Sequence, residues 1–68
     1  MKRYSKSELL HLIDEWVLGL NAQRNKSIIT DKLINGLTIS QIAEKNELSD
    51  TRVKTVIRTF RRTVEAHE

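Results

Sequence analysis

The sequence predicts an all-α fold made of four helices. Apolar residues recur at the three- and four-residue spacing of amphipathic helices rather than in the alternation that marks strands. Proline is absent, and the only glycines are Gly19 and Gly36. Helix-start signals precede three of the four apolar segments. A length of 68 residues allows one domain, residues 1–68. Helices are expected at about 6–20, 23–35, 39–46 and 50–66.

The first expected helix, 6–20, has a well-marked start. Ser5 and Glu8 have the spacing of a capping box, and Tyr4 and Leu9 have the spacing of a hydrophobic staple. The following apolar residues form one broad stripe: Leu9, Leu12, Ile13, Trp16, Val17 and Leu20. Gly19 weakens this helix near its end.

The second expected helix, 23–35, has a clear end and a poorly marked start. Asn21 and Asn25 are alternative N-caps. Its apolar residues are Ile28, Ile29, Leu33 and Ile34. Asn35 and Gly36 supply residues that tolerate a positive φ, as a helix C-terminus often requires.

The third and fourth expected helices follow each other closely. Thr38 and Gln41 form a second capping box before the helix at 39–46, and Ser49 is the N-cap of the helix at 50–66. The fourth helix has one apolar face, made of Val53, Val56, Ile57, Phe60 and Val64. Two helices joined by so short a turn form a helix-turn-helix, with Ala43 as the small residue where the helices approach.

Basic charge is concentrated on the fourth helix. The whole chain has a net charge of +3, whereas residues 49–64 contain five basic side chains against Asp50 alone. A local basic stripe is the feature expected for a polyanion partner, although a solvated helix face is the simpler explanation. The second helix of a helix-turn-helix can enter the major groove of double-stranded DNA. The candidate DNA-binding residues are Thr38, Ser49, Thr51, Arg52, Lys54, Thr55, Arg58 and Arg62.

These residues have different expected roles. Arg52 and Arg58 suit base edges, because a guanidinium can form two hydrogen bonds to guanine. Thr51 and Thr55 suit a thymine methyl group or a phosphate. Thr38 and Ser49 begin helices whose N-termini can meet phosphates, and Arg62 suits the DNA backbone. The remaining candidate, Lys54, belongs to the same polar face.

The stretch "GLTISQIAEKNELSDTRVKTVI", residues 36–57, resembles region 4 of bacterial sigma factors and the DNA-binding domain of LuxR-type regulators. The resemblance rests on Gly36-Leu37-Thr38, Ile42-Ala43, Leu48-Ser49 and Val53, and covers roughly residues 24–62. Small phage and plasmid regulators of Gram-positive bacteria look similar over the whole length. The resemblance implies a DNA-binding transcription regulator, and region 4 also implies contact with RNA polymerase.

The turn between the third and fourth helices departs from this family pattern. The pattern has glycine four residues after the alanine, where the backbone takes a positive φ, but this chain has Glu47 there. Because asparagine tolerates the left-handed conformation better than glutamate, we expect Asn46 to adopt it instead.

Several other functions are not expected. Cysteine is absent, which excludes disulfides and thiolate metal sites, and His11 with Asp14 and Glu15 is better explained as helix surface than as a metal site. No nucleophile–base pair or phosphate-binding glycine loop is present, so we expect neither an enzyme nor a cofactor. No apolar run is long enough to span a bilayer, and we expect a cytoplasmic protein.

Two alternatives to a promoter regulator remain open at this level. The domain could dock on RNA polymerase or another regulator, or it could recognise DNA within a phage packaging or recombination complex. A homodimer is suggested by Leu10 and Leu18, which lie outside the stripe, and by Phe60 and Val64 beyond the motif. Alternatively, the extra leucines close a small core.

Overall fold

The computed structural model describes residues 2–68 and contains four helices and no strand within that range. The helices are α1 (Lys6–Trp16), α2 (Ala22–Leu33), α3 (Ile39–Asn46) and α4 (Asp50–Ala66). The predicted all-α, four-helix fold is therefore confirmed. Within residues 2–68, no helix is both long and apolar enough to cross a membrane.

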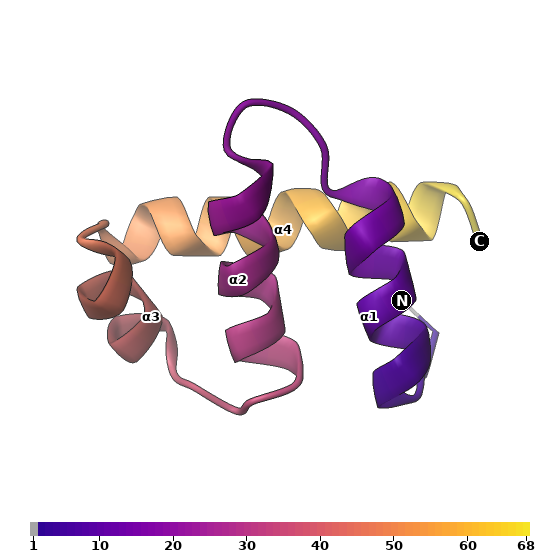
Figure 1. Ribbon diagram of the computed structural model, residues 1–68, viewed down its shortest axis with the longest axis horizontal. Helices are drawn as coiled ribbons and strands as arrows, with labels where there is room; N and C mark the ends of the chain where they lie inside the picture. The colour runs from indigo at the N-terminus through magenta and orange to yellow at the C-terminus, as the bar shows by residue number, and fades with distance from the viewer. Residues whose placement is uncertain (1) are drawn as a thin grey trace.

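The helices form two layers. Figure 1 shows α1 and α2 standing side by side across α4, which runs the length of the molecule behind them. The short α3 packs against the beginning of α4 and against α2. Because one long helix forms the second layer, a whole side of α4 remains open to solvent.

The core lies between α4 and the other three helices. Its buried apolar residues are Ile13, Val17, Ile28, Ile29, Ile42, Ala43, Val53, Val56, Ile57, Phe60 and Val64. The predicted apolar face of α4 is thus buried in full. Phe60 and Val64, which suggested a dimer surface, are used inside the chain, at 3% and 2% exposure.

All three predicted helix starts are capped as expected. Ser5 and Glu8 form the capping box of α1, and Thr38 and Gln41 form that of α3. The Ser49 hydroxyl accepts a hydrogen bond of 3.1 Å from the backbone N–H of Arg52. Each bond satisfies a backbone donor that the first helical turn leaves without a partner.

The predicted end of α1 is wrong by four residues. The helix ends at Trp16, and Val17 enters the core from extended backbone with ψ of 100°. Gly19 has φ of +100°, a conformation that helical residues do not adopt. Leu20, which was expected in the apolar stripe, is therefore fully exposed at 104%. The chain reverses here so that α2 can pack beside α1.

The bounds of α2 differ only slightly from the prediction. Asn21 is the N-cap, but its side chain makes no capping hydrogen bond, and Asn25 lies inside the helix. After α2, Gly36 adopts φ of +75°, as the Asn35-Gly36 pair indicates. The backbone N–H of Leu37 then donates to the Asp31 carbonyl at 2.9 Å.

The predicted conformation of the α3–α4 turn is also wrong. Glu47, not Asn46, adopts the left-handed conformation, with φ of 55° and ψ of 43°. Leu48 N–H donates to the Ala43 carbonyl at 2.9 Å, and Glu47 N–H to the Glu44 carbonyl at 3.3 Å, which is the pattern of a Schellman motif. Asn46 stays helical, and its side-chain amide donates to the Ile42 carbonyl at 2.8 Å. A glutamate thus adopts the positive φ that was expected to need a more tolerant residue.

Candidate nucleic-acid interface

The solvent side of α4 carries six of the eight predicted site residues. Thr51, Arg52, Lys54, Thr55, Arg58 and Arg62 are all exposed. They alternate with core residues because a helix has 3.6 residues per turn. The apolar face holds the helix in the core, and the polar face is consequently turned away from it.

Helical spacing divides the exposed residues into a central row and two flanks. Thr51, Thr55, Arg58 and Arg62 succeed one another at intervals of four, three and four residues, so they form one row opposite the buried face. We call these four residues the outward row. Arg52 and Lys54 lie on opposite flanks of it.

Arg52 and Thr55 border a groove beside α1 and α2. This groove is also lined by Trp16, Asn25 and Thr59. The side-chain oxygen of Asn25 is buried and has no hydrogen-bond partner among the described residues. Arg52 therefore lies near a polar, partly shielded surface, separate from the other predicted cations.

Lys54 and Arg58 line a second groove, between α4, α2 and the start of α3. Its complete lining is Lys32, Ile39, Lys54, Ile57, Arg58 and Arg61. We call it the basic groove. Lys32 and Arg61 were not among the predicted site residues. Arg61 could have been found from its spacing to Lys54 and Arg58, whereas the placement of Lys32 depends on how α2 packs on α4.

The two predicted residues outside α4 act as caps. The Thr38 hydroxyl accepts from Gln41 N–H at 3.1 Å, and Ser49 caps α4. Thr38 directly precedes Ile39, which lines the basic groove, so the start of α3 faces the same region as Lys54 and Arg58. Ser49 belongs to the opposite end of α3, at the turn.

Some polar groups of α4 are already engaged. The Thr55 hydroxyl donates to the Thr51 carbonyl at 3.0 Å, which leaves its oxygen lone pairs and its methyl group for a ligand. The Ser40 hydroxyl donates to the Asp50 carboxylate at 3.3 Å and links the first turns of α3 and α4. Asp50, the acidic residue in the first turn of α4, is thus held beside α3.

The cations of α4 have no charged partner among residues 2–68. The structure shows ion pairs for Lys26 with Asp14 at 3.1 Å and for Lys45 with Asp31 at 2.9 Å. None of the ion pairs within the described range involves the basic side chains of α4, namely Arg52, Lys54, Arg58, Arg61 and Arg62.

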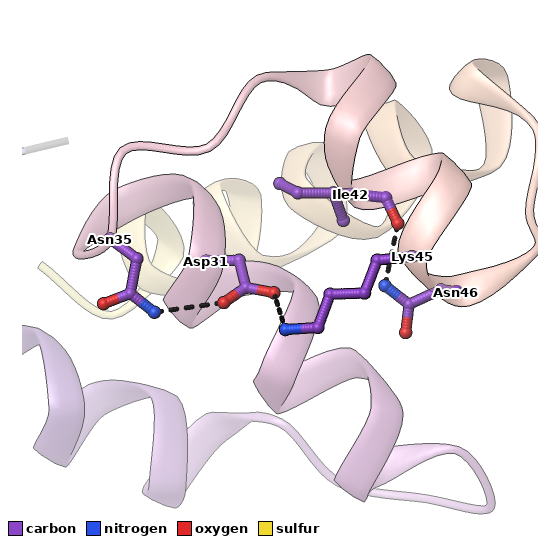
Figure 2. Close-up of polar contacts among 5 residues, drawn as sticks. All are labelled: Asp31, Asn35, Ile42, Lys45 and Asn46. Carbon is purple, nitrogen blue, oxygen red and sulfur yellow. Dashed lines mark hydrogen bonds and ion pairs between the residues drawn. The ribbon is translucent and has the colours of Figure 1, made fainter.

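A buried carboxylate braces the helix-turn-helix against α2. Asp31 is 5% exposed and accepts hydrogen bonds from Lys45 at 2.9 Å and from Asn35 at 3.0 Å, as Figure 2 shows. The hydrogen bond from Lys45 is the main cause that lowers the pKa of Asp31, against burial, which acts in the opposite direction. The sequence does not predict this brace, because its two charged residues are 14 positions apart.

The end of α4 is held by contacts with the N-terminal part of the chain. The Tyr4 hydroxyl and the Lys2 backbone N–H both donate to the Glu68 carboxylate at 2.7 Å. The ring of His67 stacks on Trp16 with centroids 4.1 Å apart. Trp16, which belongs to the predicted apolar stripe of the first helix, is half-buried and stacks with this ring. These contacts fix the far end of α4 relative to α1.

Comparisons of the chain with models of protein families, with curated proteins and with solved structures find no match.

Proposed function

We propose that this chain is a sequence-specific DNA-binding transcription regulator, of bacterial or mobile-element origin, that reads double-stranded DNA with α4. The role is a binding role without catalysis, in the cytoplasm, and its effect on a promoter would come from occlusion or recruitment. The observation that carries the proposal is the solvent side of α4, where five cations that make no ion pair within residues 2–68 accompany Thr51 and Thr55.

The arrangement of α3 and α4 supports this proposal. Because α3 is short and is joined to α4 by the tight turn at Glu47, the first turns of α4 lie at one end of the molecule. A major groove about 12 Å wide admits one α-helix. Thr51, Thr55 and Arg58 of the outward row would face the base edges, with Arg58 as the side chain best suited to guanine. Arg52 would reach the bases from its flank.

The phosphate contacts would come from residues around this row. Thr38 and Ser49 begin helices, and backbone N–H groups at helix starts bind phosphate readily. Lys54 and Arg62 would contact the backbone, which contributes to affinity without reading sequence. The exposure of the α4 cations is consistent with this division, because counterions released from DNA when cations bind its phosphates favour the complex.

Selection of bound duplexes from random DNA tests the proposal directly. We expect enrichment of a defined motif, and an affinity that falls linearly with the logarithm of salt concentration. Recovery of unrelated sequences, with no preference over a scrambled duplex at the same salt, would refute sequence-specific binding.

A protein partner is the second candidate function, and the exposed leucines favour it. Leu18 and Leu20 are 74% and 104% exposed in the α1–α2 connection, and Leu10 on α1 is 48% exposed. Exposed apolar side chains that lie together often mark partner surfaces. The partner would be a second copy of this chain, RNA polymerase, or another protein of a regulatory, packaging or recombination complex. A chain that docks only on protein would show little DNA affinity at moderate salt.

A further inference from the structure

We infer that the basic groove is a clamp for one phosphodiester strand of double-stranded DNA, in which Lys32 of α2 and Arg61 of α4 hold phosphates. This inference rests on the proposed DNA-binding function and adds a second helix to the interface. It also assigns roles to two residues outside the predicted recognition set. The clamp would fix the position of the duplex without selecting its sequence.

The composition of the groove points to an anionic occupant. Four of its six lining residues are cations, and they come from two helices that are distant in sequence. None of the four makes an ion pair within residues 2–68. Cations gathered without acids repel one another, so an occupant that brings negative charge would remove an existing cost.

The shape of the groove suits an extended strand of charge. Lys54, Arg58 and Arg61 follow one another at intervals of four and three residues, which spans about 10 Å along α4 at 1.5 Å per residue. Lys32 lines the same groove from α2, and the two apolar residues of its lining are Ile39 and Ile57. Apolar lining residues let the aliphatic stems pack while the charged ends remain in solvent.

The continuity with the outward row favours DNA over an acidic peptide. Arg58 belongs both to the outward row and to the basic groove, so a ligand on one surface extends onto the other. A helix in the major groove has a phosphate strand on each side of it. The strand on the α3 side of α4 would pass over Lys54 toward Arg61 and Lys32.

A simpler role for Lys32 must be separated by experiment. Lys32 lies in the last turn of α2, where a cation interacts favourably with the helix dipole. That role would affect stability but would not affect DNA binding or its dependence on salt. The test therefore measures salt dependence and confirms helicity separately.

The experiment compares K32Q/R61Q with the control R3Q/K6Q in the full chain. Each variant loses one lysine and one arginine, and Arg3 and Lys6 are exposed at the start of the chain, away from the groove. Binding to a selected duplex and to a scrambled duplex is titrated from low to moderate salt. Circular dichroism establishes that both variants keep the wild-type helicity.

We expect K32Q/R61Q to weaken binding to both duplexes by the same factor. Its plot of log K against log salt should be shallower than that of the control by roughly 1.8, because each neutralised phosphate contributes about 0.9. The ratio of the two affinities should not change. Equal slopes for the two variants, while the wild type still prefers its selected duplex, would overturn the clamp and leave the proposed function intact.

A failure of the proposed function would give a different result in the same titrations. The wild type would then bind neither duplex with a salt-dependent affinity, and the clamp would fall with it. Binding of poly-glutamate in preference to duplex DNA at the same salt would identify the groove as a site for acidic protein, and would also overturn the inference.

Discussion

Lys45 of α3 donates a hydrogen bond of 2.9 Å to the buried carboxylate of Asp31 in α2. This contact joins α3, the first helix of the helix-turn-helix, to α2 (Figure 2). Lys45 itself is 56% exposed, whereas the Asp31 side chain is 7% exposed. The position of α3 therefore depends on a carboxylate that has lost most of its water.

Replacing Asp31 by Ala should destabilise the fold. Asn35 and Lys45 would lose their acceptor, and a charged, buried hydrogen bond contributes about 1.5–3 kcal/mol. Because Lys45 can return to solvent, we expect a loss near the lower end of that range in the free energy of unfolding. Urea denaturation measures it. A change below about 0.5 kcal/mol would show that the brace does not hold α3.

The contribution of Asp31 should disappear in acid. Its hydrogen bonds lower the folded-state pKa below the ordinary value of 3.8, so the stabilisation is complete above that value and is lost as the pH falls through the lowered pKa. Urea denaturation of the wild type and D31N between about pH 7 and pH 2 measures the difference. The difference in the free energy of unfolding between the wild type and D31N should become smaller only at the acidic end of this range. A difference in the free energy of unfolding that does not change with pH would contradict the lowered pKa of Asp31.

Replacing Glu47 by Gly should stabilise the protein. A non-glycine residue in the left-handed region destabilises the folded state by about 1–2 kcal/mol, and glycine avoids this strain. Glycine also makes the unfolded chain more flexible, which offsets about 0.5–1 kcal/mol of the gain. We expect a net gain of about 0.5–1 kcal/mol in thermal or urea denaturation. The matched control is E44G inside α3, where glycine should cost about 1 kcal/mol. Destabilisation by both substitutions would refute the strain at Glu47.

The contact between Tyr4 and Glu68 can be measured by titration. The hydrogen bond to the Glu68 carboxylate is the main cause that raises the pKa of Tyr4 above its ordinary value of 10.0. Tyr4 is the only tyrosine, so tyrosinate absorbance reports it alone. In the variant E68Q, the pKa of Tyr4 should lie closer to 10.0 than it does in the wild type. Identical titration curves for the two proteins would show that Tyr4 does not contact Glu68 in solution.

The exposed leucines predict self-association if a second copy covers them. The wild type should sediment above the monomer mass of 7.9 kDa at micromolar concentration, and L18S/L20S should sediment at that mass. The free energy of unfolding of the monomer should change by less than about 0.5 kcal/mol, because neither side chain is buried. A wild type of 7.9 kDa at every concentration would exclude the dimer and leave these leucines to another partner.

The helix starts could be predicted more accurately than the helix ends, and for a physical reason. Ser5, Thr38 and Ser49 cap their own helices through hydrogen bonds three residues away, so local sequence determines where those helices begin. The end of α1 at Trp16 depends instead on how Val17 enters a core formed by distant residues. The apolar periodicity of this segment continues to Leu20, although α1 ends at Trp16.

The candidate site shows the same difference between local and long-range information. The outward row follows from helical spacing within α4, and all four of its members were among the predicted site residues. The basic groove could not be predicted in full, because Lys32 reaches it only through the packing of α2 on α4. Asp31 and Lys45 likewise meet only after α3 has folded against α2. The left-handed residue of the turn was predicted to be Asn46, because asparagine tolerates that conformation better than glutamate. The Schellman hydrogen bonds instead require it one position later, at Glu47.

The most direct test of the account is the affinity of R52A and R58A for the selected duplex, relative to a scrambled duplex at the same salt. Both side chains are exposed, so both variants should keep their helicity. We predict that each loses about 1–3 kcal/mol on the selected duplex and less on the scrambled one, with preference relaxed at one base position. R62A, in contrast, should weaken binding to both duplexes equally and reduce the salt slope by roughly one. If R52A and R58A fold and both bind the selected duplex as the wild type does, α4 does not read DNA and the account is wrong.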